Sequence, residues 1–209
     1  MGSTMTTGMH KRKRWAFGGP LLAIALASLP LASPAHAIAT ADAAATAPRN
    51  DDSAQQDAQA VRRELDNFKA AQVSLRQAMA IAEGLHADST TADVSFDGAS
   101  EPAVFRVKTV QRDRLWRHTI NAATGEVVGD GAASPLNELG AEDRGNLSVL
   151  RGLRHRLSDA VGVAEHATSG KAISGGLTRE RGKLNFVIVV VSGSDLKEVI
   201  LEPPRARTR

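Results

Sequence analysis

Apolar residues recur at helical spacing in two stretches of this chain. In Leu75–Leu85 they fall at i, i+3, i+4 and i+7, namely Leu75, Ala78, Met79 and Ala82. This is the pattern of one buried helix face. The pattern returns 82 positions later, from Leu75 to Leu157, with Leu157, Ala160, Val161 and Ala164. We therefore expect two amphipathic helices, the first capped by Ser74 with Gln77 and stopped at Gly84.

Short segments with period-two alternation follow each helix. In the first half, Trp116, His118 and Ile120 are expected on one face of a strand and Arg117 on the other. One polar and one apolar face is typical of antiparallel strands covered on one side. The expected strands are Asp93–Phe96, Val104–Val110, Leu115–Asn121, Ala172–Leu177, Leu184–Val191 and Leu196–Leu201.

These elements predict an α+β fold with two repeats, each a helix packed on a small antiparallel β-sheet. Each repeat also has a lead-in helix, and the first lead-in helix is expected to end near Val73. The predicted divisions are a signal peptide at 1–37, a flexible linker at 38–59, a first repeat at 60–130, a linker at 131–145, a second repeat at 146–202 and a basic tail at 203–209.

The segment Phe186–Val191 is apolar at every position, so both of its faces are expected to be buried. One face belongs on its own helix. The other is expected to pack inside the monomer as part of a central strand, or to meet a second chain or a partner. A homodimer through Leu184–Val191 is one form of the second alternative.

The first 37 residues have the three parts of a secretory signal peptide. A basic segment, 10–14, precedes an apolar segment, 15–31, and Ala35-His36-Ala37 forms a small-residue cleavage site. Cleavage after Ala37 predicts a periplasmic or secreted protein with no membrane span left. Met5 or Met9 could be the true start, and export is expected in either case.

Cleavage also changes the charge balance of the chain. Residues 1–37 hold four of the 26 Lys and Arg and no Asp or Glu, which leaves 22 basic against 23 acidic residues. The basic isoelectric point therefore belongs to the precursor, and a nucleic-acid partner, which needs a basic face, is not expected. The chain has no cysteine, so burial rather than disulfides must stabilise it.

The layout resembles a tandem pair of PepSY domains. The residues that carry the resemblance are VSLRQAMAIAEGL at Val73–Leu85, VFRVKTV at Val104–Val110 and LWRHTINAATGEVV at Leu115–Val128, with LSDAVGVAEHATSGKA at Leu157–Ala172 in the second copy. They are similar to the family's pattern of an Ala-x-x-x-Ala helix, two or three strands and a closing Asp-x-x-Thr-Gly-x-Val turn. Asn121 stands in place of the Asp, and the second copy ends in Glu202-Pro203-Pro204 without that turn.

The resemblance implies a non-enzymatic extracytoplasmic module. The family is similar to a segment of secreted metallopeptidase propeptides, and this similarity implies an inhibitory or regulatory role toward a peptidase. The expected partner is accordingly a protein, either a peptidase or a sensor ectodomain.

The side chains suited to catalysis or metal binding form no recognisable set. The chain after Ala37 has four histidines, His86, His118, His155 and His166, and no cysteine, so a metal site would need histidine and carboxylate ligands. Glu83 and Glu165 occupy equivalent positions, which indicates a structural role. Ser192-Gly193-Ser194 lacks the context of a hydrolase nucleophile and is interpreted as a turn. No enzyme activity, cofactor or metal is expected.

Four residues are candidates for contact with a partner: Trp116, Arg112, Arg114 and Arg117. Tryptophan is common at the centre of interfaces, although packing of Trp116 under a helix is the simpler interpretation. The arginines would receive an acidic partner, or would be a solvated hairpin tip. The predicted function is protein binding, with modulation of a peptidase or sensor. The alternatives are a small-ligand or metal-ion sensor that uses His118 and His166, and a purely structural envelope module.

Overall fold

The computed structural model describes residues 51–150, 152–153, 155–180 and 182–203, with side-chain positions from residue 55 onward. The predicted signal peptide lies outside these residues, as does the basic tail apart from Pro203. Within the described part, no helix is long and apolar enough to cross a membrane.

Four α-helices, one short 3-10 helix and seven strands make up the described chain. In order they are α1 (Asp51–Ala70), α2 (Leu75–Gly84), β1 (Thr90–Asp97), β2 (Val104–Gln111), β3 (Arg114–Asn121), β4 (Ala132–Pro135), η1 (Leu136–Glu138), α3 (Ala141–Leu150), α4 (Leu157–Thr168), β5 (Lys171–Glu180), β6 (Lys183–Ser192) and β7 (Asp195–Leu201). All six predicted strands are confirmed, and most extend beyond their expected ends.

The strands form one antiparallel sheet in the order β4-β3-β2-β1-β5-β6-β7. The predicted strands are antiparallel, but they form a single sheet and not one small sheet for each repeat, because β1 pairs with β5 through Val94↔Gly175 and Ser95↔Ser174. The pairing of strands from distant parts of the chain leaves no local pattern in the sequence. A mixed α/β fold with helices and a single seven-stranded sheet is the result.

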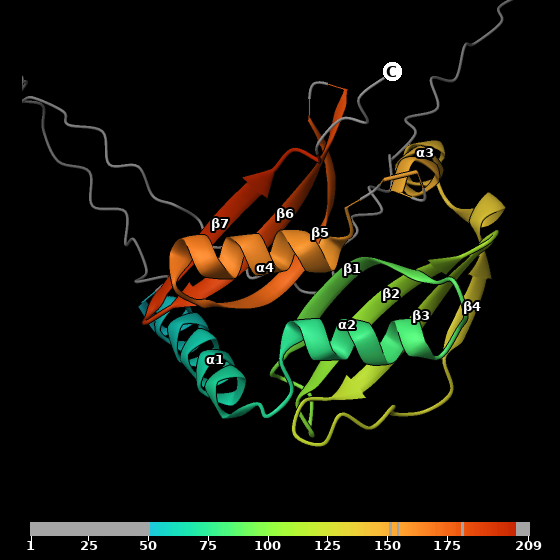
Figure 1. The fold of residues 1–209 in the computed structure, drawn as a ribbon. Helices are drawn as coiled ribbons and strands as arrows, with labels where there is room; N and C mark the ends of the chain where they lie inside the picture. The colour runs from blue at the N-terminus through green and yellow to red at the C-terminus, as the bar shows by residue number, and fades with distance from the viewer. Residues whose placement is uncertain (1–50, 151, 154, 181, 204–209) are drawn as a thin grey trace, which may run out of the picture.

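Helices α2 and α4 lie side by side on one face of this sheet (Figure 1). Their predicted apolar faces are confirmed, because both sets of four residues are buried: Leu75, Ala78, Met79 and Ala82 on α2, and Leu157, Ala160, Val161 and Ala164 on α4. Each buried leucine stabilises the fold by about 1.5–3 kcal/mol. The alanines let the helix backbone approach the sheet closely.

The start of α2 follows the sequence prediction. Ser74 Oγ accepts a hydrogen bond from the backbone N–H of Gln77, and Gln77 Oε1 accepts one from the N–H of Ser74 at 2.8 Å. This capping box satisfies two of the free N–H groups at the helix start. The lead-in helix α1 ends at Ala70, close to the predicted break, and α2 ends at Gly84 as predicted.

Both predicted linkers contain regular structure. The segment 38–59 was expected to be flexible, but α1 begins at Asp51, since alanine and glutamine favour helix even without an apolar face. The segment 131–145 contains β4, η1 and the start of α3. Strand β4 adds to the sheet edge through Trp116↔Ala133 and three neighbouring pairs, so Gly and Pro residues there mark turns around a strand.

The expectation that both faces of Phe186–Val191 are buried is wrong for its central valines. Phe186, Ile188 and Val190 are buried, whereas Val187 and Val189, on the other face, are only partly buried. The helices cover one face of the sheet, so a fully apolar strand leaves its second face partly open. The adjacent Ile200 on β7 is 46% exposed.

Glu83 and Glu165 have the structural role that their equivalent positions predicted. Glu83 Oε1 accepts a hydrogen bond from the backbone N–H of Thr91 at 2.8 Å, and Glu165 Oε1 accepts one from the N–H of Ala172 at 2.9 Å. Each carboxylate thus ties the end of its helix to the start of the following strand. Glu83 also forms an ion pair with Arg156 at 3.3 Å, which links α2 to the start of α4.

The turn after β3 is built around Asn121. Its Oδ1 accepts hydrogen bonds from the N–H groups of Ala123 and Thr124, at 2.8 and 3.1 Å. Gly125 follows with φ of +78°, a conformation that favours glycine. The carbonyl of Ala122 in the same turn accepts bonds from Gln72 and Val73 just before α2, so the turn also positions the helix.

We predict that Asn121→Ala lowers the free energy of unfolding by about 1–2 kcal/mol, because two backbone donors lose their acceptor. Asn121→Asp keeps the acceptor oxygen and is the matched control, expected to stay near the wild-type value. Urea unfolding followed by circular dichroism measures both. An Asn121→Ala variant as stable as the Asp variant would contradict this account of the turn.

A second prediction concerns Gly170, between α4 and β5. A Cβ at this position would overlap the carbonyl oxygen of Val191 and lie 2.6 Å from Val190 Cγ1. We expect Gly170→Ala to destabilise the protein by about 1–3 kcal/mol, since backbone must move to relieve the overlap.

Gly84, at the end of α2, is the control for Gly170 because a Cβ there would meet no atom within 4 Å. We expect Gly84→Ala to be neutral or to stabilise the protein by up to about 1 kcal/mol through helix propensity. The same urea titration compares the two variants. Equal stabilities would mean that the β5–β6 contact at Gly170 adapts without cost.

Candidate functional site

The four predicted partner-contact residues lie on or beside the β2–β3 hairpin. The two strands pair up to Gln111↔Arg114, which leaves Arg112 and Asp113 as the turn. Arg112 has φ of +53° and, like Arg114, is exposed. Arg117 is half-buried and donates a hydrogen bond from Nη1 to Ser134 Oγ on β4 at 2.8 Å.

Strand alternation places Trp116 and Arg117 on opposite faces of the sheet. Trp116 lies on the face covered by α2, together with His118 and Ile120, as the period-two pattern predicted. Arg117 lies on the other face, beside β4. The structure therefore does not gather the four residues into one surface: two arginines mark the hairpin turn, one braces the edge strand, and Trp116 packs near the helix.

Trp116 stacks on a residue that the sequence did not single out. The ring of His86, just beyond the end of α2, lies 3.8 Å from the Trp116 ring with planes 24° apart. The His86 ring is also 5.3 Å from that of His118. His86 is in a polar loop segment with no periodic signal, so only the folded structure brings it to the sheet.

The buried polar side-chain atoms that have no hydrogen-bond partner among the described residues all lie in one strip of the sheet. They are Thr91 Oγ1, Thr109 Oγ1, Trp116 Nε1, His118 Nδ1 and His118 Nε2. Thr91 is opposite Thr109 in the β1–β2 register, Thr109 is opposite Trp116 in the β2–β3 register, and His118 is the next residue on the same face. We refer to these four residues as the polar strip.

His118 is the titratable member of the polar strip. Its side chain is only 3% exposed. Burial lowers the pKa of its imidazole below the ordinary value, and the nearby His86 lowers it further. Gly131 leaves room for the ring, because a Cβ on Gly131 would come within 2.8 Å of His118 Nδ1. Burial therefore favours the neutral form of this imidazole.

The hypothesis of a metal site with His118 and His166 gains no support from their positions. His118 is buried on β3 in the first half, and His166 is exposed on the last turn of α4 in the second half. Within the described residues, no group of three or more His, Cys, Asp or Glu side chains is placed to hold a metal ion. His86 and His118 are thus a pair without a third ligand of these types.

The serine-rich turn Ser192-Gly193-Ser194 has a structural role. Gly193 has φ of +65° in the β6–β7 hairpin. Ser192 Oγ donates a hydrogen bond to the carbonyl oxygen of Thr168 at the end of α4, at 3.1 Å. The hydroxyl thus joins the helix end to the hairpin, in agreement with the interpretation of this segment as a turn.

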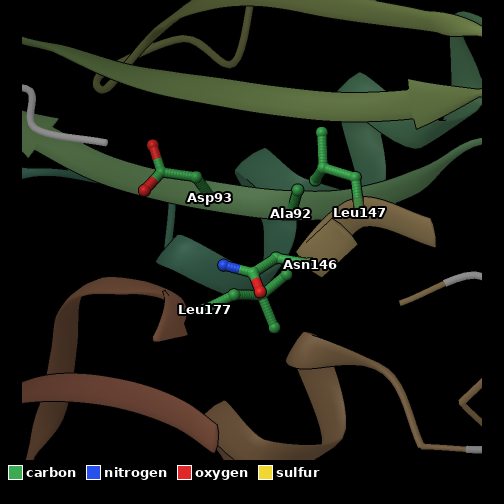
Figure 2. Close-up of a pocket in the computed structure, with 5 residues that line it drawn as sticks. All are labelled: Ala92, Asp93, Asn146, Leu147 and Leu177. Atoms are coloured by element: carbon green, nitrogen blue, oxygen red, sulfur yellow. The ribbon is translucent and has the colours of Figure 1, made fainter. Parts of the chain in front are cut away.

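A small hollow lies where β1, α3 and β5 meet. Its lining residues are Ala92, Asp93, Asn146, Leu147 and Leu177, shown in Figure 2. Asp93 forms an ion pair with Lys108 at 2.9 Å. Burial raises the pKa of Asp93, with Lys108 acting in the opposite direction. Asn146 Oδ1 accepts a hydrogen bond from Arg179 Nε at 2.8 Å. The hollow has room for about one water molecule, so these polar groups brace α3 against the sheet.

Comparison with known proteins finds a family similarity for one segment of the chain. Residues 72–130 match the family model described as "Peptidase propeptide and YPEB domain", PepSY. A crystal structure described as that of a "putative lipoprotein" from Clostridium difficile 630 aligns with 16% sequence identity and a TM-score of 0.39, covering 64% of this chain and 88% of that chain. No curated protein matches the sequence.

The matched segment coincides with a structural unit. It begins just before α2, includes β1, β2 and β3, and ends after the Asn121 turn. The resemblance that rested on the Ala-x-x-x-Ala helix, the strands and the closing turn is confirmed for residues 72–130. Residues 72–130 are therefore the part of the chain that is similar to the PepSY family, and they form one helix-and-strand unit of the structure.

Proposed function

We propose that this chain is an exported, non-enzymatic protein-binding module made of two PepSY-type units, which modulates a secreted or periplasmic peptidase or a sensor ectodomain. The observation that carries the proposal is the match of residues 72–130 to a family described as a peptidase propeptide domain. The signal-peptide pattern at 1–37 supports an extracytoplasmic location.

The second unit is supported by the order of elements after α4. Both α2 and α4 are followed by three antiparallel strands. The helices are 82 positions apart in sequence, as Leu75 and Leu157 are, whereas the strands are 81 apart. The irregularity in β1 between Thr91 and Asp93 corresponds at this spacing to the one in β5 between Ala172 and Ser174.

Further details agree at the same spacing of 81. The positive-φ residues Asp88 and Arg112 correspond to Ser169 and Gly193. Val94 pairs across the β1–β5 joint with Gly175, which is its own counterpart. Two like units joined through equivalent residues would be related by an approximate two-fold axis at this pair. One residue fewer between helix and strand in the second unit accounts for the change from 82 to 81.

The edge strand β7 is the surface that we assign to the partner. Strand β7 forms one border of the sheet and pairs only with β6 among the described strands, so its outer backbone edge can accept an extended segment of another protein. The opposite border, β4, has only four residues. On the open face, Ile200 of β7 and the partly buried Val187 and Val189 of β6 offer apolar contact to side chains of the added strand.

We expect a chain beginning at residue 38 to capture a peptidase or a sensor ectodomain from periplasmic extract of the organism that encodes it. Mass spectrometry identifies the captured protein, and cleavage of a fluorogenic peptide by the purified peptidase measures modulation. Capture without any peptidase or sensor, combined with a higher melting temperature in the presence of a divalent cation or small ligand, would contradict the proposal and favour a ligand sensor.

The variant Ile200→Lys tests the assignment of β7, and we expect it to weaken binding at least about tenfold, because a charge then lies in the contact surface. Val163→Lys is the matched control: Val163 is 56% exposed but lies on α4, over the other face of the sheet. Equal binding by the two variants would show that the partner does not use the β7 border.

A further inference from the structure

We propose that the polar strip and His86 form an acid-sensitive latch, which holds the end of α2 on β3 at neutral pH and releases it when His118 is protonated. This inference does not depend on the proposed peptidase partner. It rests on the placement of two imidazoles and one indole between the helix end and the sheet.

Protonation of His118 in the folded protein is energetically unfavourable. A neutral imidazole has one N–H donor, whereas the charged form has two donors. Neither ring nitrogen of His118 has an acceptor among the described residues, and both are buried. Protonation would therefore add an unpaired donor and a charge to a site enclosed by Trp116, Thr109 and the helix end. A second charge on His86, with its ring centroid 5.3 Å away, would repel the first.

The charged groups of the surrounding elements do not compensate this cost. On α2, Glu83 bonds to the Thr91 N–H and to Arg156. On β2, Lys108 lies on the opposite face of the sheet with Asp93, and on β3, Arg117 likewise faces away, toward Ser134.

The connecting segments add only exposed carboxylates. Asp88, in the segment after α2, and Asp130, beside Gly131, are both exposed. Neither is hydrogen-bonded to an imidazole of the latch in the described structure. Two segments lie against the His118 ring: the one after α2, through His86, and the one with Gly131. We assign the response to protonation to the segment after α2, because it carries the second imidazole.

That segment, residues 85–89, is tied to the end of α2 by the backbone N–H groups of Leu85 and His86, which donate to the carbonyls of Ala82 and Glu83. Three further contacts hold it. His86 stacks on Trp116, the Gln111 side-chain amide donates to the carbonyl of Ala87 at 2.8 Å, and Ser89 Oγ donates to the carbonyl of Glu83 at 3.0 Å. Leu85, which joins the segment to α2, is already 44% exposed. Its release would expose Trp116 without breaking any strand pairing.

The second half of the sheet indicates that the polar strip is not required for folding. The spacing of 81 relates Thr91, Thr109 and His118 to three positions under α4. These positions are occupied by the apolar residues Ala172, Val190 and Val199. Ala172 and Val190 are fully buried there. The fourth residue of the strip, Trp116, corresponds to the exposed Lys197. The same arrangement of helix and strands thus forms without the buried polar atoms of Thr91, Thr109 and His118, and a histidine at position 118 needs a reason other than packing.

The expected direction of the pH effect follows from the lowered pKa of His118. Because the folded state binds this proton more weakly than the unfolded state, stability is fully present above the ordinary histidine pKa of 6.5 and falls as the pH drops below it. The loss ends once the pH passes below the lowered pKa of the folded state. Local release of residues 85–89 is the part of this response that the latch predicts.

Tryptophan fluorescence provides the test. The sequence has two tryptophans, Trp15 and Trp116, so a chain beginning at residue 38 retains only Trp116. Between pH 7.5 and pH 5.0 we expect a red shift of its emission and a rise of about threefold in acrylamide quenching, centred in the range where histidines titrate. Hydrogen exchange of amides 85–89 should accelerate over the same range relative to those of α4.

The variant His118→Val introduces the residue found at the corresponding position in the second half, and it should abolish both changes. His166→Gln removes an exposed histidine on α4 and should leave them intact. If His118→Val fails to fold, hydrogen exchange of amides 85–89 in the wild-type chain still tests whether this segment is released at low pH. A wild-type chain with pH-independent quenching and exchange, or a His118→Val chain that keeps the response, would overturn the latch.

Discussion

The pairing of β1 with β5 is the contact on which the rest of the structure depends. It joins a set of four strands and a set of three into one sheet, yet its register contains only Val94↔Gly175 and Ser95↔Ser174. So short a joint needs support from other contacts. The packing of α2 beside α4 and the ion pair between Glu83 and Arg156 supply it, from the same side of the sheet. Separation of the halves would expose the inner edges of β1 and β5, and unpaired edges invite aggregation.

This joint also explains why the two faces of the sheet differ. Because both halves present their helices on the same side, that side is closed, with Phe105, Phe186 and Ile188 fully buried beneath the helices. The other face carries ion pairs such as Arg106 with Asp97 at 2.6 Å. Near β7 it carries partly exposed valines instead. A sheet with one open face can bind a partner there without any change in its core.

Local sequence patterns predicted the helices and strands, but they did not predict which distant strands pair. The i, i+3, i+4, i+7 spacing located the buried faces of α2 and α4, and alternation placed Trp116 and His118 on the helix side, because these periods follow from backbone geometry. The single sheet, the pairing of β4 with β3 and the contact of His86 with Trp116 join segments distant in sequence, and no periodicity encodes them. The prediction that both faces of the apolar segment in β6 are buried was wrong for another reason. Apolar side chains favour burial, but whether Val187 and Val189 are buried also depends on what the fold places against them.

Comparison of the two halves distinguishes residues that the fold of each unit requires from residues that the fold does not require. Glu83 and Glu165 make the same bond to the following strand, and this agreement marks a requirement of the fold. His118 has no such counterpart, since Val199 occupies the corresponding register. Buried polar atoms without partners reduce stability, and a chain that folds the second half without them has no structural need of them in the first. Selection for stability alone would favour valine at position 118, so the histidine points to a role in which the charge of that site matters.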